Sequence, residues 1–181
     1  MAGSILLIIA LSLFGLAVAF FYMKKVTSIP LDLGLDKESS DRLKAIHGAI
    51  AEGAMAFLKQ EYRVLVWFVL GFAVVIGLLT DNHETAENNE GWFTAIAFVF
   101  GAAISILSGY IGMKVATAGN ARTTVSARNG LADAFVVAIN SGAVMGFALV
   151  SLATLGMTLI YLFMKTMLAD VPNNVLMEVI A

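Results

Sequence analysis

Residues 92–122 read WFTAIAFVFGAAISILSGYIGMKVATAGNAR, and this stretch decides the fold class. It opens with a run of about 20 apolar residues, the length that an α-helix needs to cross the hydrocarbon core of a bilayer. Gly101, Ser105 and Gly109 recur within it at every fourth position. Residues at this spacing share one helix face, and small side chains there let a second helix approach closely. The stretch therefore predicts a transmembrane helix that packs against another helix.

The composition of the whole chain also indicates a membrane protein. Of its 181 residues, 60% are hydrophobic and 13% are charged, and the mean hydropathy is +0.89. Soluble domains of this size carry about 25% charged residues. The net charge of −2 and the lack of a basic stripe argue against nucleic acid as a partner. The chain contains no cysteine, which excludes disulfides, thiolate metal sites and a cysteine nucleophile.

Four apolar segments predict an all-α, multi-pass transmembrane helix bundle. The expected membrane spans are 4–23, 64–80, 92–116 and 131–164. The second helix is expected to start near residue 40, outside the bilayer, because Ser39 or Ser40 can cap it and apolar residues then recur at helical spacing. A helix over 40–80 would be about 60 Å long, about twice the hydrocarbon thickness.

The basic residues predict the orientation of these spans. All Lys and Arg residues except Lys165 lie in or next to the connections 24–63 and 117–130, whereas the connection 81–91 is acidic. The positive-inside rule then places the two basic connections in the cytoplasm and the N-terminus outside. In the first span the lysines follow the apolar run. Because a secretory signal places its basic residues first, we interpret this segment as a membrane helix.

Small residues at helical spacing predict the packing faces of the third and fourth helices: Gly101, Ser105, Gly109, Gly142 and Gly146. Five polar residues within or beside the helices are candidates for a functional role: Glu52, Glu61, Arg122, Asp133 and Asn140.

Each polar candidate has a functional and a structural interpretation. Glu52 and Glu61 could hold a proton or a cation if buried, but a solvated helix face explains them better. Arg122 lies in a polar turn that could bind an anion or simply connect two helices. For Asp133 and Asn140 we favour, respectively, stabilisation of a helix N-terminus and an interhelical hydrogen bond over an ion pathway. No catalytic, cofactor or metal-binding motif is present in the sequence.

Three segments of the chain together carry a resemblance to a known protein family. They read IAEGAMAFLKQEY at 50–62, SILSGYIGMKVA at 105–116 followed by NART at 120–123, and LADAFVVAINSGAVMG at 131–146. Together, and in this order, they resemble the membrane-bound pyrophosphatases, which are ion pumps driven by pyrophosphate hydrolysis. The resemblance covers residues from about 40 to 164.

The resemblance implies a sixteen-helix fold with two concentric rings, usually as a homodimer in a prokaryotic cell membrane. It also implies hydrolysis of Mg²⁺-bound pyrophosphate, outward pumping of H⁺ or Na⁺, and in some members a role for K⁺. In that family the acidic substrate-binding motifs and the ion gate follow the fourth helix. Because this sequence lacks them, we expect residues 1–181 to be the N-terminal part of such a pump, structural and inactive alone, with no bound metal of its own. The alternative is a self-contained four-helix membrane scaffold without enzymatic activity.

Overall fold

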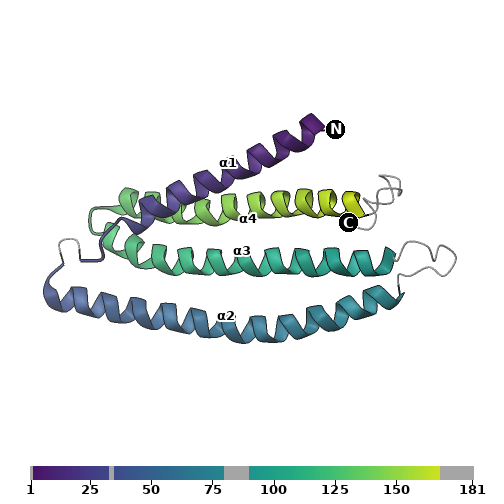
Figure 1. Cartoon of the computed structure of the whole chain (residues 1–181). Coiled ribbons are helices and arrows are strands. Elements are labelled where there is room, and N and C mark those ends of the chain that lie inside the picture. Colours follow the sequence, from purple (N-terminus) through teal and green to yellow (C-terminus); the bar gives the residue numbers. More distant parts are fainter. Residues whose placement is uncertain (1, 33–34, 80–89, 168–181) are drawn as a thin grey trace.

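The computed structural model describes residues 2–32, 35–79 and 90–167 of the chain (Figure 1). Its four helices are α1 (Ala2–Thr27), α2 (Lys37–Leu79), α3 (Glu90–Ser126) and α4 (Leu131–Met167). Each contains a segment that is long and apolar enough to cross a membrane. The predicted all-α, multi-pass architecture is therefore confirmed.

The four helices lie side by side in a single layer. α4 packs between α1 and α3, and α3 packs between α4 and α2, while α1 makes a few contacts with α3. Figure 1 shows α1 diverging from α4 toward its N-terminus and α2 bowing along α3. Within the described ranges α1 and α2 do not pack against each other, so both broad faces of the layer stay open.

The start of α2 differs from the expected one by a few residues. The backbone N–H of Ser39 donates to the Asp36 carboxylate at 3.0 Å, and the N–H of Ser40 donates to the Asp36 carbonyl at 2.9 Å. Asp36, rather than Ser39 or Ser40, is therefore the residue that caps the helix. A carboxylate at this position also interacts favourably with the positive end of the helix dipole.

The end of α3 lies ten residues beyond the apolar run that predicts it, at Ser126. Polar residues lie within this extension of the helix, and their hydroxyls donate to carbonyls one turn earlier. Thr117 bonds to Met113 at 3.0 Å, and Thr123 bonds to Gly119 at 2.9 Å. A short turn then leads into α4 through Gly130, whose φ of 133° is a conformation that favours glycine.

Buried apolar residues form small clusters between neighbouring helices instead of one large core. One cluster joins α1, α3 and α4 and consists of small or β-branched residues: Ala19, Val115, Val144 and Ala148. A second holds α4 against α3 and consists mainly of larger residues: Ile160, Met164 and Phe93, with Ala97. The small side chains of the first cluster let the helix backbones approach closely.

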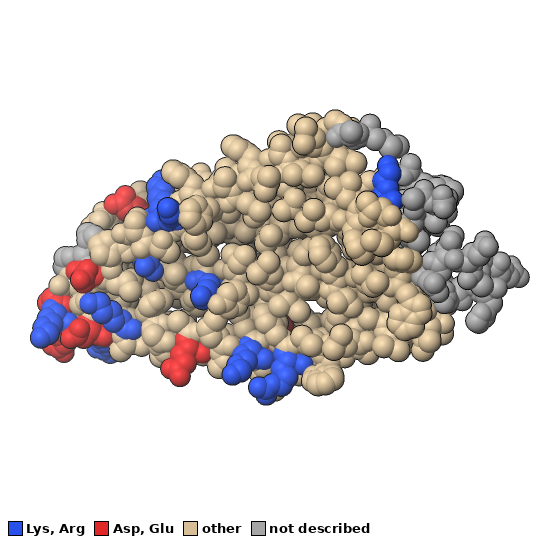
Figure 2. Space-filling view, viewed as in Figure 1, with Lys and Arg blue, Asp and Glu red and all other residues tan. Residues whose placement is uncertain are grey.

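Charged side chains are concentrated at one end of the layer, where α1 and α3 end and α2 and α4 begin, and along the adjoining part of α2 (Figure 2). Most of the remaining surface in this view is uncharged. The structure thus gathers at one end the basic residues that the sequence places in its first and third connections.

Candidate functional site

Arg122, near the end of α3, caps the end of α1. Its Nε donates to the carbonyl of Ile29 at 3.1 Å, and its Nη2 donates to the carbonyl of Thr27 at 3.2 Å. Its Nη1 donates to Ala118 within α3 at 2.9 Å. The last carbonyls of a helix lack hydrogen-bond donors within that helix. Here the guanidinium, which is distant in sequence, donates to them. In this structure Arg122 therefore joins α1 to α3.

Beside this cap lies a hollow of about 360 Å³ between α1, α4 and the end of α3. It brings Asp133 and Asn140 together, one from the first turn of α4 and one from two turns later. Lys25 of α1 and Ser126 and Asn129 of the α3–α4 corner complete its polar lining. We call this hollow the corner pocket. The interhelical hydrogen bond expected for Asn140 is not formed within the described residues.

The two glutamates of α2 lie elsewhere. Glu52 is exposed on the charged part of the helix, and Glu61 is also exposed but lines a separate hollow of about 390 Å³ against α3. Of the five polar candidates, the structure therefore places Asp133 and Asn140 in the same pocket, and Arg122 lies next to that pocket. Within the described ranges, no three His, Asp or Glu side chains are placed to hold a metal ion.

Gly109 is the member of the predicted packing set that contacts another helix. Tyr62 of α2 donates a hydrogen bond from Oη to the carbonyl of Ile106 at 2.9 Å, and its phenol oxygen lies over Gly109. A Cβ atom added to Gly109 would be 2.7 Å from that oxygen. The sequence analysis did not identify Tyr62 as a packing residue. The pattern that could have indicated it is a tyrosine at the point where the second helix enters its apolar segment.

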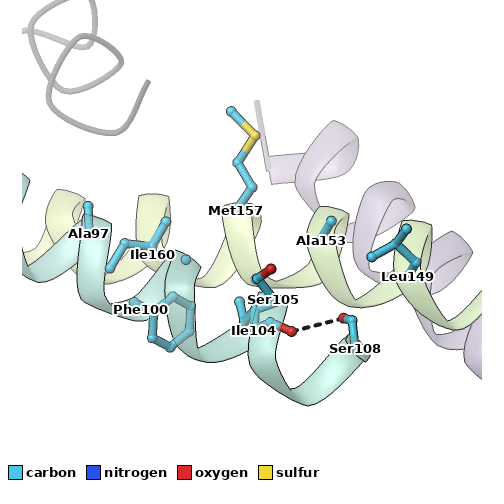
Figure 3. A pocket seen from close by; sticks show the side chains of 11 residues that line it. Ala97, Phe100, Ile104, Ser105, Ser108, Leu149, Ala153, Met157 and Ile160 are labelled. Carbon is cyan, nitrogen blue, oxygen red and sulfur yellow. Dashed lines mark hydrogen bonds between the residues drawn. The ribbon is translucent and has the colours of Figure 1, made fainter. Parts of the chain in front are cut away.

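The other predicted packing residues face open space. Gly101 and Ser105 line a groove of about 450 Å³ along α3 and α4, opposite Ala153 (Figure 3). In this view the Ser108 hydroxyl donates back to the Ile104 carbonyl, at 2.9 Å, as the dashed line shows. A Cβ added to Gly101, Gly142 or Gly146 would meet nothing within 4 Å. The four-residue spacing of small side chains predicts where such faces lie on a helix, but it does not predict which part of a face a neighbouring helix covers.

Five glycines outside the predicted set lie close to a neighbouring helix instead: Gly77 of α2 faces Trp92 of α3, Gly112 of α3 faces Met145 of α4, and three more also lie at contacts with α4. Gly15 of α1 contacts Ser151 of α4, and Gly119 of α3 contacts Ser141 of α4. Gly156 of α4 contacts the end of Ile104. These contacts hold α4 between its neighbours. In the sequence, only the serines of α4 that face two of these glycines could have indicated the contacts.

Comparison with known proteins relates this layer of helices to a single family. Residues 13–181 match the profile of a family described as inorganic H⁺ pyrophosphatase. A K⁺-insensitive pyrophosphate-energized proton pump 2 of Moorella thermoacetica is 45% identical over 119 residues, which are 66% of this chain and 16% of that protein.

Two further relatives show the same pattern of coverage. A putative K⁺-stimulated pyrophosphate-energized sodium pump of Clostridium tetani is 41% identical over 62% of this chain and 16% of its own length. A K⁺-insensitive proton pump of Chloroflexus aurantiacus is 34% identical over 86% of this chain and 21% of its own length. The chain thus spans about a fifth of the length of the curated relatives it matches.

Proposed function

Because this chain belongs to the inorganic H⁺ pyrophosphatase family, we propose that it is the N-terminal, supporting part of a pyrophosphate-energised ion pump. The family match over residues 13–181 is the observation that carries the proposal. Its relatives are named as pyrophosphate-energized pumps, and the four membrane-length helices fit an integral membrane protein of that kind.

The supporting role follows from how polar groups are used. The guanidinium of Arg122 is engaged by backbone carbonyls, and the carboxylates of α2 and α4 are dispersed. We propose that hydrolysis of Mg²⁺-pyrophosphate, and any need for K⁺ or Na⁺ as activator, depend on parts of the pump outside this sequence. The pump would be a homodimer, and its other helices would cover the open groove of α3 and α4.

The ion that is pumped outward, H⁺ or Na⁺, would also be selected outside these helices. A relative named a proton pump and one named a sodium pump match this chain at 45% and 41% identity. The overall similarity of this chain therefore does not follow the ion that the relatives are named for. This similarity supports a role in holding the fold rather than in transport itself.

A phosphate-release assay tests the supporting role. The purified 181-residue chain, given Mg²⁺ and pyrophosphate in detergent, should release no phosphate above background, while the Moorella thermoacetica pump serves as the positive control. A chimera of that pump carrying this chain in place of its matching segment should retain pyrophosphate-driven proton transport. Robust Mg²⁺-dependent hydrolysis by the chain alone would refute the proposal, and so would a folded chimera that cannot pump.

We also propose that the charged end of the layer faces the cytoplasm of a prokaryotic cell and that the start of α1 lies outside. The chain has no native cysteine, so a single introduced thiol gives a unique label. In intact cells an impermeant maleimide should label Gly3→Cys and should label Lys44→Cys only after lysis; both positions are exposed. The reverse pattern would exclude this orientation.

A further inference from the structure

The corner pocket lies at the depth of lipid headgroups. The apolar run of α1 from residue 4 to 23 is about 30 Å long as a helix, which matches the thickness of the hydrocarbon core. Lys25, Val26 and Ile29, which follow this run directly, line the pocket. The pocket therefore opens where the hydrocarbon ends and the headgroup layer begins, whatever the function of the whole protein.

Asn140 provides an accessible polar group in the wall of this pocket. Its side chain lines the pocket and the residue is 9% exposed, yet it makes no hydrogen bond to any described residue. Among the described side chains only Ser40 has a fully buried polar atom without a partner, so the Asn140 amide is reached from the pocket and can bond there to water or to a ligand. The amide offers both donors and an acceptor to whatever occupies the pocket.

Two opposite charges frame the same space without pairing with each other. Lys25 and Asp133 both line the pocket, and no ion pair joins them to each other or to other residues in the described ranges. A ligand that contains both an anion and a cation can bind both charges at once. The remaining lining is apolar and includes Val26, Val136 and Val137, which suits the glycerol and the first acyl carbons of a lipid.

We propose that the corner pocket binds a glycerophospholipid with an ethanolamine headgroup. The phosphate lies toward Lys25 and the amide of Asn140, and the primary ammonium donates to the Asp133 carboxylate. Phosphatidylglycerol would place its phosphate at the same Lys25, but its terminal glycerol brings no positive charge to the Asp133 carboxylate. A choline headgroup has no N–H to donate to that carboxylate.

The test is lipid retention by the full 181-residue chain. The protein is reconstituted in nanodiscs with equal amounts of phosphatidylethanolamine, phosphatidylglycerol and phosphatidylcholine, released, and analysed by native mass spectrometry. We expect preferential retention of phosphatidylethanolamine. Lys25→Gln should reduce that retention several-fold, and Asp133→Asn should remove the preference over phosphatidylcholine.

Lys24→Gln is the matched control. Lys24 neighbours Lys25 but lies over the ring of Phe20, with Nζ 4.8 Å from the ring centroid, and it does not line the pocket. Its replacement should leave lipid retention unchanged. Equal retention of the three lipids by the unaltered chain would overturn the proposal, as would a preference for phosphatidylglycerol. So would an equal effect of the two lysine variants.

Discussion

Replacing Gly109 by alanine tests the contact that joins α2 to α3. The added methyl carbon would be 2.7 Å from Tyr62 Oη, which is too close for either atom to stay in place. The phenol is the end of a side chain and can move, but moving it breaks its 2.9 Å hydrogen bond to the carbonyl of Ile106. Gly109→Ala should therefore remove the same interaction that Tyr62→Phe removes.

The size of the effect follows from that shared hydrogen bond. Interhelical hydrogen bonds in membrane proteins are worth about 0.6 kcal/mol on average and up to about 1.7 kcal/mol. Tyr62→Phe should lose about this much, Gly109→Ala should lose it relative to the gain that alanine brings over glycine in a helix, and the double variant should lose it only once. The two changes are then strongly non-additive, as expected for residues in direct contact. Once the hydroxyl is removed, the next ring atom, Cζ, is 3.9 Å from the new methyl, an ordinary contact.

Unfolding by sodium dodecyl sulfate in mixed micelles, followed by far-UV circular dichroism, measures these differences. Gly101→Ala is the control, because it makes the same chemical change in the same helix with nothing within 4 Å of the new methyl. It reports the intrinsic gain of alanine over glycine in a helix. The reasoning fails if Gly109→Ala and Gly101→Ala are equally stable, or if the losses of Gly109→Ala and Tyr62→Phe simply add.

Three further outcomes are expected. Arg122→Lys should cost about 1.5–3 kcal/mol in the same assay, because hydrogen bonds from a charged group are lost at the end of α1; no loss would exclude the cap as a stabilising contact. Gly119→Ala should cost about 1–3 kcal/mol through its collision with Ser141, whereas the open position Gly142→Ala should not. Hydrogen bonds from Ser39 lower the pKa of Asp36 below its ordinary value of 3.8, so the start of α2 should lose stability as the pH falls through that lowered pKa. Amide exchange near Ser39 should show this acid-induced loss, and Asp36→Asn should not show it.

The four helices could be predicted because hydropathy over a membrane-length window is a local property of the chain. The end of α3 was not predictable in this way. Its last ten residues are mostly polar or small, and Arg122 among them is held by the end of α1. This hold depends on a contact between residues 93 positions apart, which no local pattern contains.

In the candidate site, too, the sequence indicates individual residues but not the contacts that helix packing gives them. Spacing predicts a small-residue face of α3 that contains Gly101 and Gly109, and in the structure an added Cβ would meet a neighbouring helix at Gly109 but not at Gly101. Which turn of a face is covered depends on the crossing of α2, and therefore on Tyr62. Asn140 and Asp133 could be named from the sequence, but Lys25, which completes their pocket, comes from a helix more than 100 residues away in the chain.

Most of the hydroxyls in the described membrane segments bond to the backbone of their own helix. An ion path needs a row of polar atoms that are free to replace water around the ion. In the described parts of α1, α3 and α4, Ser12, Ser108, Thr154 and Thr158 each donate to the carbonyl four residues earlier. Ser105, which opens onto the groove, makes no such bond among the described residues, and one hydroxyl does not form a path. A layer whose hydroxyls bond mainly to its own backbone is suited to pack against lipid and against other helices.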